Sequence, residues 1–364
     1  MMKLLSQLNK ADLEGKKVLL RVDFNVAVKN NVVQETAKIK AHKEFIDFLM
    51  GCGARVVMIT HISAKKGALE SYGLIIDTIQ DVLGRPVAFC KNILGSDRFD
   101  MLASHQLVML ENLRTTPAEE ANDVDFARSL AEGFDLYVDD AFANVHRPHA
   151  SMVAVTKFLP SYVGPLIVAE TEALSKIIDS PSQGKVVVLG GAKIESKLLV
   201  IDNFLSKAEH VLVGGALANN FFKLQGKDIG KSLYDPEKMD AIKDIDISRI
   251  SLPIDTVVSD DMILDIGPKS QEQFASMISK AKSVLWCGAM GMYETPEFSH
   301  GTTAIAQVVA KAPFSVIGGG DTITSARKLG LLDKFSYVST GGGAMLEFLA
   351  GMKLPALKAL GYYE

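Results

Sequence analysis

Hydrophobic residues occur along this chain in short continuous runs that alternate with segments of helical period. Four runs in the first half have the length of a strand and little polar alternation: KVLLRV (17–22), ARVVMIT (54–60), QLVML (106–110) and DLYVDD (135–140). Helical periodicity marks the segments 35–50, 69–84 and 123–133. Apolar strands separated by helices are typical of a parallel sheet that is covered on both faces. The pattern therefore predicts an α/β fold.

In the second half, each strand-like run ends in glycine. The runs are VVVLGG (186–191), HVLVGG (210–215), VLWCG (284–288), FSVIGGG (314–320) and FSYVSTGGG (335–343). In open α/β sheets, ligands bind beyond the carboxyl ends of the strands, where glycines let backbone amides approach them. The helix that follows such a loop presents N–H groups suited to phosphate. One glycine pair could be an ordinary tight turn, but their repetition favours a nucleotide-binding domain.

The length and composition indicate two soluble domains. A chain of 364 residues exceeds the ~250 residues that one core usually serves, and 48% of its residues are hydrophobic and 23% charged. No apolar run approaches the ~18 residues of a membrane span. The first residues are too polar for a signal peptide, and the three cysteines lie far apart. We therefore expect a cytoplasmic protein without a disulfide framework or membrane contact.

Arginine is scarce and unevenly placed. Only nine of the 39 basic residues are arginines, and seven of these lie in the first 150 residues. That region still carries slightly more acidic than basic side chains, which argues against a nucleic-acid-binding domain. Polar groups follow its predicted strands in RVDFN (21–25), THIS (60–63), ENLR (111–114) and DDAFANVHRPH (139–149). Because arginine binds phosphate and carboxylate with two parallel hydrogen bonds, these ends predict a site for a small phosphorylated acid.

Three further features have two interpretations each. His146 and His149 have a spacing that a metal site could use, but no cysteine or carboxylate pattern accompanies them. The segment GGAKIESK (190–197) lacks the Walker A spacing. Its Lys193 and Lys197 would share one helix face near an anion, or be solvated surface lysines. Asp321 follows three glycines, where it would cap a helix or hold Mg²⁺ on nucleotide phosphates.

Several of these segments are motifs of a known family. They are RVDFNV (21–26), ENLR (111–114), DDAFANVHRPHAS (139–151), GGAKIESK (190–197), GGALANNFF (214–222), LPIDTVVSDD (252–261), DIGPKS (265–270), GGGDT (318–322) and STGGGAMLEFL (339–349). In this order, over nearly the whole chain, they resemble phosphoglycerate kinase. The resemblance implies two Rossmann-like, three-layer domains joined by an interdomain helix at 165–179 and a hinge. Residues 1–164 with the tail 350–364 would bind 3-phosphoglycerate, and residues 165–349 would bind MgATP or MgADP.

The resemblance also implies roles for individual residues. Those that bind the acid substrate would be Asp23, Phe24, Asn25, Lys38, His61, Ile62, Ser63, Ala64, Arg114 and Arg147. Those that bind the nucleotide would be Lys193, Lys197, Gly214, Gly215, Glu294, Gly319, Gly320, Asp321 and Thr322, with Asp321 on Mg²⁺. Catalysis would depend on Lys38, Lys193 and Gly320. The family expectation for the oligomeric state is a monomer.

The chain departs from the family pattern at a few positions. Lys38 stands where the family has an essential arginine, and Ala64 stands at the arginine of the family's HLGRP, with Lys65 next to it. Cys287, beside the nucleotide loop, begins a Cys-Gly-Ala that replaces the family's Asn-Gly-Pro, and it would be a redox-sensitive or a buried inert thiol.

Three functions are therefore compatible with the sequence. The first is an active phosphoglycerate kinase. The second is a degenerate member with a binding or regulatory role. The third is a kinase for another small acid.

Overall fold

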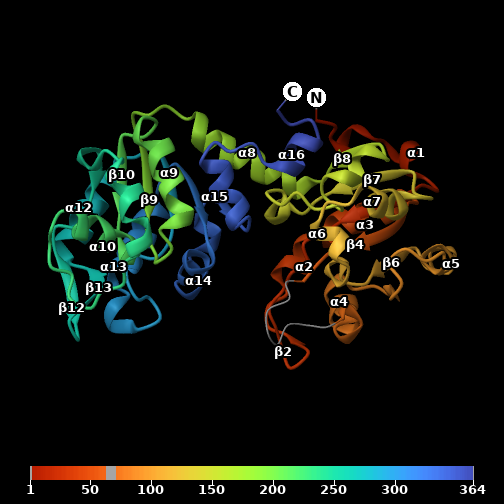
Figure 1. Ribbon diagram of the computed structural model, residues 1–364, viewed down its shortest axis with the longest axis horizontal. Coiled ribbons are helices and arrows are strands. Elements are labelled where there is room, and N and C mark those ends of the chain that lie inside the picture. Colours follow the sequence, from red (N-terminus) through yellow and green to blue (C-terminus); the bar gives the residue numbers. More distant parts are fainter. Residues whose placement is uncertain (1, 63–70, 364) are drawn as a thin grey trace. The chain divides into compact units, whose positions relative to one another are not determined.

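The computed structural model describes residues 2–62 and 71–363. The chain forms two compact units: one extends to Glu170 and includes the segment from Lys353 onward, and the other is Thr171–Met352. Figure 1 shows the course of the chain through both. Two residues expected to bind substrate, Ser63 and Ala64, lie outside the described residues, as does Lys65.

The first unit is built on a parallel sheet of six strands in the order β5-β6-β4-β1-β7-β8. Its strands are β1 (Lys17–Arg21), β4 (Arg55–Ile59), β5 (Ala88–Cys90), β6 (Leu107–Leu110), β7 (Leu136–Asp139) and β8 (Ser161–Val163). The four runs expected from the sequence form the central strands, and their apolar side chains are buried because helices cover both faces. The edge strands β5 and β8 have three residues each and were not predicted.

Short helices surround this sheet. They are α1 (Lys10–Leu13), α2 (Ala37–Ala41), α3 (Lys43–Gly51), α4 (Ile76–Leu83), α5 (Asp97–Ser104), α6 (Pro117–Glu120), α7 (Val124–Ala131) and α16 (Pro355–Ala359); a small hairpin comprises β2 (Val28–Lys29) and β3 (Val32–Val33). The helix expected over 35–50 is divided at His42, which lies between α2 and α3. The end of the chain belongs to this unit, where the Ala356 N–H donates to the Val145 carbonyl.

The second unit has a parallel sheet in the order β11-β10-β9-β14-β15-β16. Its strands are β9 (Lys185–Leu189), β10 (His210–Val213), β11 (Ile250–Ser251), β14 (Ser283–Cys287), β15 (Phe314–Gly318) and β16 (Tyr337–Ser339). This is the order of a Rossmann sheet, in which the chain reverses direction between β9 and β14. An antiparallel hairpin of β12 (Thr256–Ser259) and β13 (Met262–Ile266) was not predicted. The α/β prediction is confirmed.

Helices cover the second sheet as well. They are α9 (Glu195–Leu205), α10 (Gly215–Leu224), α11 (Met239–Lys243), α12 (Pro268–Ile278), α13 (His300–Val309), α14 (Gly320–Lys328) and α15 (Gly343–Leu349). Helix α8 (Pro165–Asp179) begins in the first unit and continues into the second, over the range that the resemblance implies. Trp286 is fully buried at the centre of this core. Within the described parts of the chain, no helix is long and apolar enough to cross a membrane.

Candidate active site

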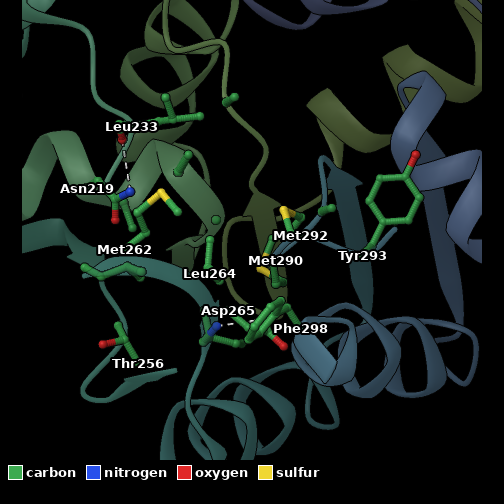
Figure 2. A pocket seen from close by; sticks show the side chains of 18 of the residues that line it. Asn219, Leu233, Thr256, Met262, Leu264, Asp265, Met290, Met292, Tyr293 and Phe298 are labelled. Carbon is green, nitrogen blue, oxygen red and sulfur yellow. Dashed lines mark hydrogen bonds between the residues drawn. The ribbon is translucent and has the colours of Figure 1, made fainter. Parts of the chain in front are cut away.

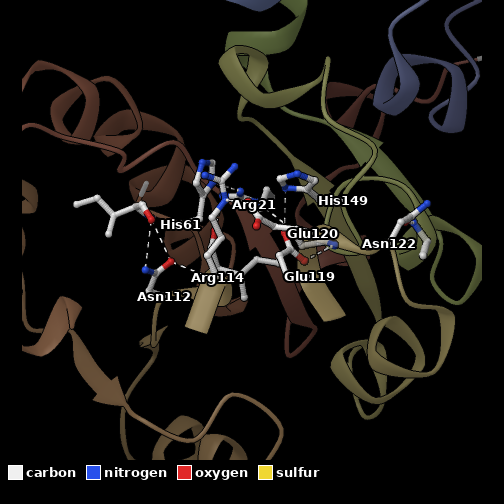
Figure 3. Close-up of polar contacts among 12 residues, drawn as sticks. Arg21, His61, Asn112, Arg114, Glu119, Glu120, Asn122 and His149 are labelled. Carbon is white, nitrogen blue, oxygen red and sulfur yellow. Dashed lines mark hydrogen bonds and ion pairs between the residues drawn. The ribbon is translucent and has the colours of Figure 1, made fainter. Parts of the chain in front are cut away.

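A buried arginine organises the carboxyl edge of the first sheet (Figure 3). Arg21, the last residue of β1, is fully buried, and its Nη2 lies 2.6 Å from His61 Nδ1. Its Nη1 donates to the Val22 carbonyl at 2.7 Å, and its Nε donates to Ser151 Oγ at 3.1 Å. These contacts fix the arginine on several sides, so that it holds the His61 ring in one orientation.

The contact with Arg21 also determines the tautomer of His61. A guanidinium can only donate, so Nδ1 accepts and the hydrogen of the neutral ring is on Nε2. Burial and the charges of Arg21, Arg114 and Arg147 lower the pKa of His61 far below its usual value. Among the described residues, none forms a hydrogen bond with the buried Nε2. His61 therefore presents a neutral N–H group that can donate a hydrogen bond to a ligand.

Besides Arg21, two further arginines, Arg114 and Arg147, lie close enough to His61 to lower its pKa. Arg114, in the 3₁₀ helix Leu113–Thr115 after β6, has its Nε 3.1 Å from Glu120 Oε1. Asn112 Oδ1 accepts from the N–H groups of Ile62 and Arg114, both at 3.1 Å, and so joins the loops after β4 and β6. Burial and Arg147 lower the pKa of the Arg114 guanidinium. We call Arg21, His61, Arg114 and Arg147 the basic cluster.

The histidines beside the basic cluster are uncharged at neutral pH. Burial, together with the neighbouring arginines, lowers the pKa of both His146 and His149 to about 4. His149 Nδ1 lies 3.8 Å from Oε1 of the buried Glu119. The same carboxylate accepts from Ser151 Oγ at 2.6 Å, and this hydroxyl in turn accepts from Arg21. The contacts of these histidines are those of neutral groups that pack beside an anion site.

An acidic residue and a lysine form an ion pair near the end of β1. Lys38 Nζ, from α2, lies 2.7 Å from Asp23 Oδ2, and the Asn25 N–H donates to Asp23 Oδ1 at 3.2 Å. Asp23 is buried, whereas Asn25 and Lys38 are half-buried. All three of these expected residues are therefore close together.

Two residues of the expected acid site do not present their side chains to a ligand. The side chains of Phe24 and Ile62 are buried in the apolar core. The Phe24 N–H donates to Thr60 Oγ1 and its carbonyl accepts from Tyr72 Oη, both at 3.1 Å. These two positions support the loop, and any contact of theirs with a ligand would use the backbone.

A cavity of about 480 Å³ opens at the carboxyl edge of the second sheet, where the chain reverses (Figure 2). Its wall is largely apolar and includes Leu233, Met262, Leu264, Met290 and Phe298. Glu294 and Asp321 also line it. The apolar wall is suited to a flat apolar group, and the two carboxylates can accept hydrogen bonds from polar substituents on it.

Hydrogen bonds between the loops after β9, β10 and β14 form one end of this cavity. The Gly191 N–H donates to the Ala289 carbonyl at 2.7 Å, and the Gly215 N–H donates to the Met290 carbonyl at 3.0 Å. The Gly214 N–H donates to the Leu189 carbonyl at 2.9 Å. These amides were expected to be available to phosphate, but the carbonyls already use them. The glycines instead provide space, because a Cβ on Gly215 would lie 2.6 Å from the Ala289 oxygen.

The two lysines of GGAKIESK have different surroundings. The expectation that they share a helix face is wrong, because α9 begins at Glu195 and Lys193 precedes it. Lys193 is exposed, whereas Lys197 is only 7% exposed and is not a solvated surface lysine. Burial lowers the pKa of Lys197, and Cys287 and Asp321 partly offset this. A Cβ on Gly191, which has a φ of +79°, would lie 3.5 Å from Lys197 Nζ.

Glycines precede Asp321 at the start of α14. Gly319 is the N-cap with φ 93°, Gly320 is the first helical residue, and no side chain caps the helix. The capping interpretation of Asp321 is therefore wrong. Its exposed carboxylate accepts from Tyr293 Oη at 3.4 Å, and burial and this carboxylate raise the pKa of Tyr293 to about 12. Thr322 is buried, and its Oγ1 accepts from the Gly288 N–H at 2.7 Å, which leaves its backbone for a ligand.

Cys287 lies under the same loop. It is buried, and burial raises the pKa of its thiol to about 11. A thiol of this kind stays protonated at neutral pH and has little reactivity. The structure therefore favours the inert interpretation of this cysteine.

Some residues of the site could not be recognised from their sequence positions. Arg21 and Ser151 lie at the ends of quoted motifs but received no role there, and Glu119 lies in a segment without a functional pattern. The signal for Arg21 was its charge within a strand that the pattern predicts to be buried, because a buried arginine needs several acceptors.

Both units have a candidate site at the carboxyl edge of their sheet, a basic cluster in the first and a largely apolar cavity in the second. Together with the Rossmann-like sheet of the second unit, they define an α/β protein whose class is that of binders of small charged molecules at the carboxyl ends of parallel strands.

Comparisons with known proteins identify the family. A family model described as phosphoglycerate kinase matches residues 8–352. The phosphoglycerate kinase of Dictyoglomus turgidum is 37% identical over 98% of both chains, and that of Pelotomaculum thermopropionicum is 39% identical over 96% of this chain and 97% of the relative. The chain therefore belongs to the phosphoglycerate kinase family.

Solved structures agree with this assignment. The structure of phosphoglycerate kinase from Coxiella burnetii matches with a TM-score of 0.85 and 32% identity, over 100% of this chain and 99% of that one. The phosphoglycerate kinase of Pyrococcus horikoshii matches with a TM-score of 0.88 and 30% identity, over 99% and 98%. The protein is a kinase with phosphoglycerate kinase activity, a step of glycolysis. Neither the fold nor the comparisons support the degenerate alternative.

Proposed function

We propose that the first unit binds 3-phosphoglycerate and that the second binds ATP or ADP with Mg²⁺. The reaction is reversible phosphoryl transfer between 1,3-bisphosphoglycerate and ADP, which gives 3-phosphoglycerate and ATP. The observation that carries the division of substrates is the buried Nε2–H of His61, which Arg21 holds in place beside Arg114 and Arg147. A neutral donor within a positive cluster is suited to the carboxylate and phosphate of a small acid.

On the acid side, His61, Arg114 and Arg147 hold the phosphate and carboxylate of 3-phosphoglycerate. Asp23 and Asn25 bind its glycerate part, because a carboxylate and an amide can accept and donate at a hydroxyl. Lys38 takes the place of the family's arginine. It neutralises charge on the transferring group as a point charge, whereas arginine would form two directed hydrogen bonds.

On the nucleotide side, the apolar cavity receives the base. Glu294 accepts from the ribose hydroxyls, and Lys197 contacts the phosphates. The first turn of α14, with Gly319, Gly320, Asp321 and Thr322, binds phosphate oxygens through its N–H groups. Lys193, exposed before α9, and Gly320 stabilise the transferring phosphoryl group.

Asp321 is suited to hold Mg²⁺ on the nucleotide phosphates. Within the described residues, no three histidine, cysteine or acidic side chains gather into a metal site. A single carboxylate beside bound phosphates is nevertheless the usual arrangement for Mg²⁺ with a nucleotide. The exposed carboxylate of Asp321, which α14 presents beside the cavity, meets this requirement. Bound Mg²⁺ would neutralise charge that develops on the phosphate oxygens.

The reaction needs neither a nucleophile nor a general base from the protein. When ADP accepts the phosphoryl group, a carboxylate is the leaving group, and in the reverse direction that carboxylate is the acceptor. Because a carboxylate carries no proton, none has to move. The residues of the chain bring the reactants into line and cancel negative charge. Because the substrates bind to different units, we propose that hinge bending precedes transfer and excludes water that would hydrolyse the acyl phosphate. We further propose that the enzyme acts as a cytoplasmic monomer.

Calorimetric titration with 3-phosphoglycerate tests the acid site directly. The unmodified protein should bind 3-phosphoglycerate without nucleotide, and His61→Ala should weaken binding about tenfold or more, since it removes a buried hydrogen bond to a charged ligand. The control is His210→Ala, which changes a half-buried histidine of the second unit, at the start of β10. Equal affinities of the His61→Ala and unmodified proteins would refute the proposed acid site.

A further inference from the structure

The backbone of Asp23 is held by a buried histidine for which the proposed mechanism has no role. His42, between α2 and α3, is 1% exposed. Its Nε2 lies 3.0 Å from the Asp23 amide nitrogen, and its Nδ1 lies 2.9 Å from Asp140 Oδ2. The ring therefore connects the loop after β1 with the residue that follows β7.

These two contacts fix the protonation of the ring. The Asp23 amide is a donor, so His42 Nε2 accepts and carries no hydrogen. The hydrogen of the neutral ring is then on Nδ1, which donates to the Asp140 carboxylate. A carboxylate on one ring nitrogen commonly sets the tautomer and orientation through which the other nitrogen acts.

Hydrogen bonds hold both the side chain and the backbone of Asp140. Its Oδ1 accepts from the Leu166 N–H at 2.7 Å in the first turn of α8, and its own N–H donates to the Arg21 carbonyl at 3.0 Å. The chain makes room for this carboxylate at Gly164, where a Cβ would lie 2.3 Å from Asp140 Oδ1. A carboxylate fixed in this way gives His42 a rigid support.

The same connection continues to the ion pair of the acid site. Asp23 Oδ2 lies 2.7 Å from Lys38 Nζ, and Asp23 Oδ1 accepts from the Asn25 N–H at 3.2 Å. With its amide on His42, Asp23 is held through both its backbone and its side chain. We propose that His42 is a positioning residue: supported by Asp140, it holds the Asp23 amide and thereby aims the Asp23–Lys38 pair at the acid substrate. The inference rests on the proposed role of Asp23 in binding that substrate.

Steady-state kinetics of two His42 variants test this inference. His42→Leu removes both hydrogen bonds and should raise the KM for 3-phosphoglycerate about tenfold, with the KM for ATP within about twofold. His42→Gln has an amide oxygen and an NH₂ group at a spacing similar to the ring nitrogens, and it should restore the KM to within about threefold of the unmodified enzyme. A role in stability alone predicts an unchanged KM in the folded fraction of both variants, which would overturn the proposal.

A control and a double variant separate positioning from general damage. Arg98→Met removes an equally buried hydrogen-bonding side chain of the first unit, whose partners are the carbonyls of Ile93, Ser129 and Glu132. It should lower the thermal midpoint and leave the KM for 3-phosphoglycerate unchanged. In an Asp23→Ala background, His42→Leu should have little further effect on that KM, because its route of action is gone. Additive effects would contradict the inference.

Two further results decide the remaining cases. If Asp23→Ala alone leaves the KM for 3-phosphoglycerate unchanged, the proposed role of Asp23 fails. If that variant raises the KM and His42→Leu does not, only the inference about His42 fails. Should His42→Leu not fold, ¹⁵N NMR of the histidines in the unmodified protein provides a second test. We expect the Nδ1–H tautomer for His42, and a hydrogen on Nε2 would overturn the proposal.

Discussion

In the proposed acid site, the tautomer and the charge of the histidines depend on the neighbouring residues more than on the ordinary pKa of the imidazole. Arg21 fixes the tautomer of His61, and burial with the surrounding arginines keeps His61 and His149 neutral. Positive charge in the cluster is therefore carried by arginines, while the histidines add donors without adding repulsion. Several cationic and neutral groups can therefore face one small anion.

Lys38 stands at the position where the resemblance implies an essential arginine. We expect Lys38→Met to lower kcat/KM about a hundredfold, because it removes a fixed charge from the transition state. Lys38→Arg should raise kcat if Lys38 occupies the position of the family's arginine. The matched control is Lys40→Met on the same helix, an exposed lysine whose loss should leave kcat/KM unchanged. Equal loss in both methionine variants would show that the effect comes from α2 and not from Lys38.

Asp139 should make the stability of the enzyme depend on pH. Burial raises the pKa of this carboxyl to about 7, against about 4 in an unfolded chain. The contribution of Asp139 to the free energy of unfolding is fully present below pH ~4 and is lost as the pH rises through ~7. The reason is that the carboxyl releases its proton more easily in the unfolded chain than in the folded protein. Asp139→Asn should therefore raise the urea midpoint at pH 8 and leave it nearly unchanged at pH 4.

The control for this measurement is Asp125→Asn, which changes a carboxylate with a side chain that is 86% exposed. The urea midpoint of Asp125→Asn should differ from that of the unmodified protein by the same small amount at both pH values. A midpoint for Asp139→Asn that differs from the unmodified protein equally at pH 4 and pH 8 would contradict the assignment of a raised pKa.

The motifs predicted which segments lie at the edge of the first sheet, but they could not indicate which of their side chains are buried. Asp23, His61, Arg114 and Lys38 were expected, and the structure describes them at one sheet edge. Phe24 and Ile62 were expected to bind substrate through motif membership alone, yet both side chains lie in the core. A motif marks a segment of chain, and only packing decides which of its side chains face outward.

At the scale of elements, the loops after the strands of the second unit have two tasks. The glycine loops after β9 and β10 bond to the loop after β14 and build the cavity wall, which uses up their amides. The loop before α14 is different, since Gly319 turns the chain with a φ of 93° into a helix whose first residues were expected to bind phosphate. Glycine repetition in the sequence could not distinguish these two uses.

A substitution in the α14 loop tests this distinction. Gly319→Ala should destabilise the protein by about 1 kcal/mol because of its positive φ, and it should weaken ATP binding several-fold, since the added Cβ would lie 3.2 Å from Cys287 Sγ. Gly330→Ala is the matched control, with φ +66° and no atom within 4 Å of its Cβ. It should cost similar stability and leave ATP affinity unchanged in calorimetry. Similar affinity loss in both would mean that strain alone is responsible.

The sequence predicted long apolar strands well and short or irregular elements poorly. The edge strands β5 and β8 contain three residues each, too few to show a period, and the hairpin of β12 and β13 has half-buried strands that lack a clear alternation. The division of the 35–50 helix could not be predicted, because His42 interacts with residues far away in the chain. Local periodicity does not contain such long-range contacts.

At the scale of the whole molecule, two Rossmann-like units each present a candidate site at the carboxyl edge of a parallel sheet. In the proposed function, the acid site uses fixed charges at the end of a buried sheet, and the nucleotide site uses an apolar cavity next to a helix start. We propose that the two units, with α8 leading from one to the other, bind their substrates independently before transfer. The chain length and the alternation of apolar strands with helical segments were sufficient to predict two domains, because each unit repeats the same pattern of buried strands and covering helices.

The most direct test is turnover of 3-phosphoglycerate and MgATP in an assay coupled to the consumption of 1,3-bisphosphoglycerate. The account predicts a rate within tenfold of ordinary phosphoglycerate kinases, since charge neutralisation by Lys38 and the other basic groups is retained. Binding of ATP in calorimetry without measurable turnover would contradict it.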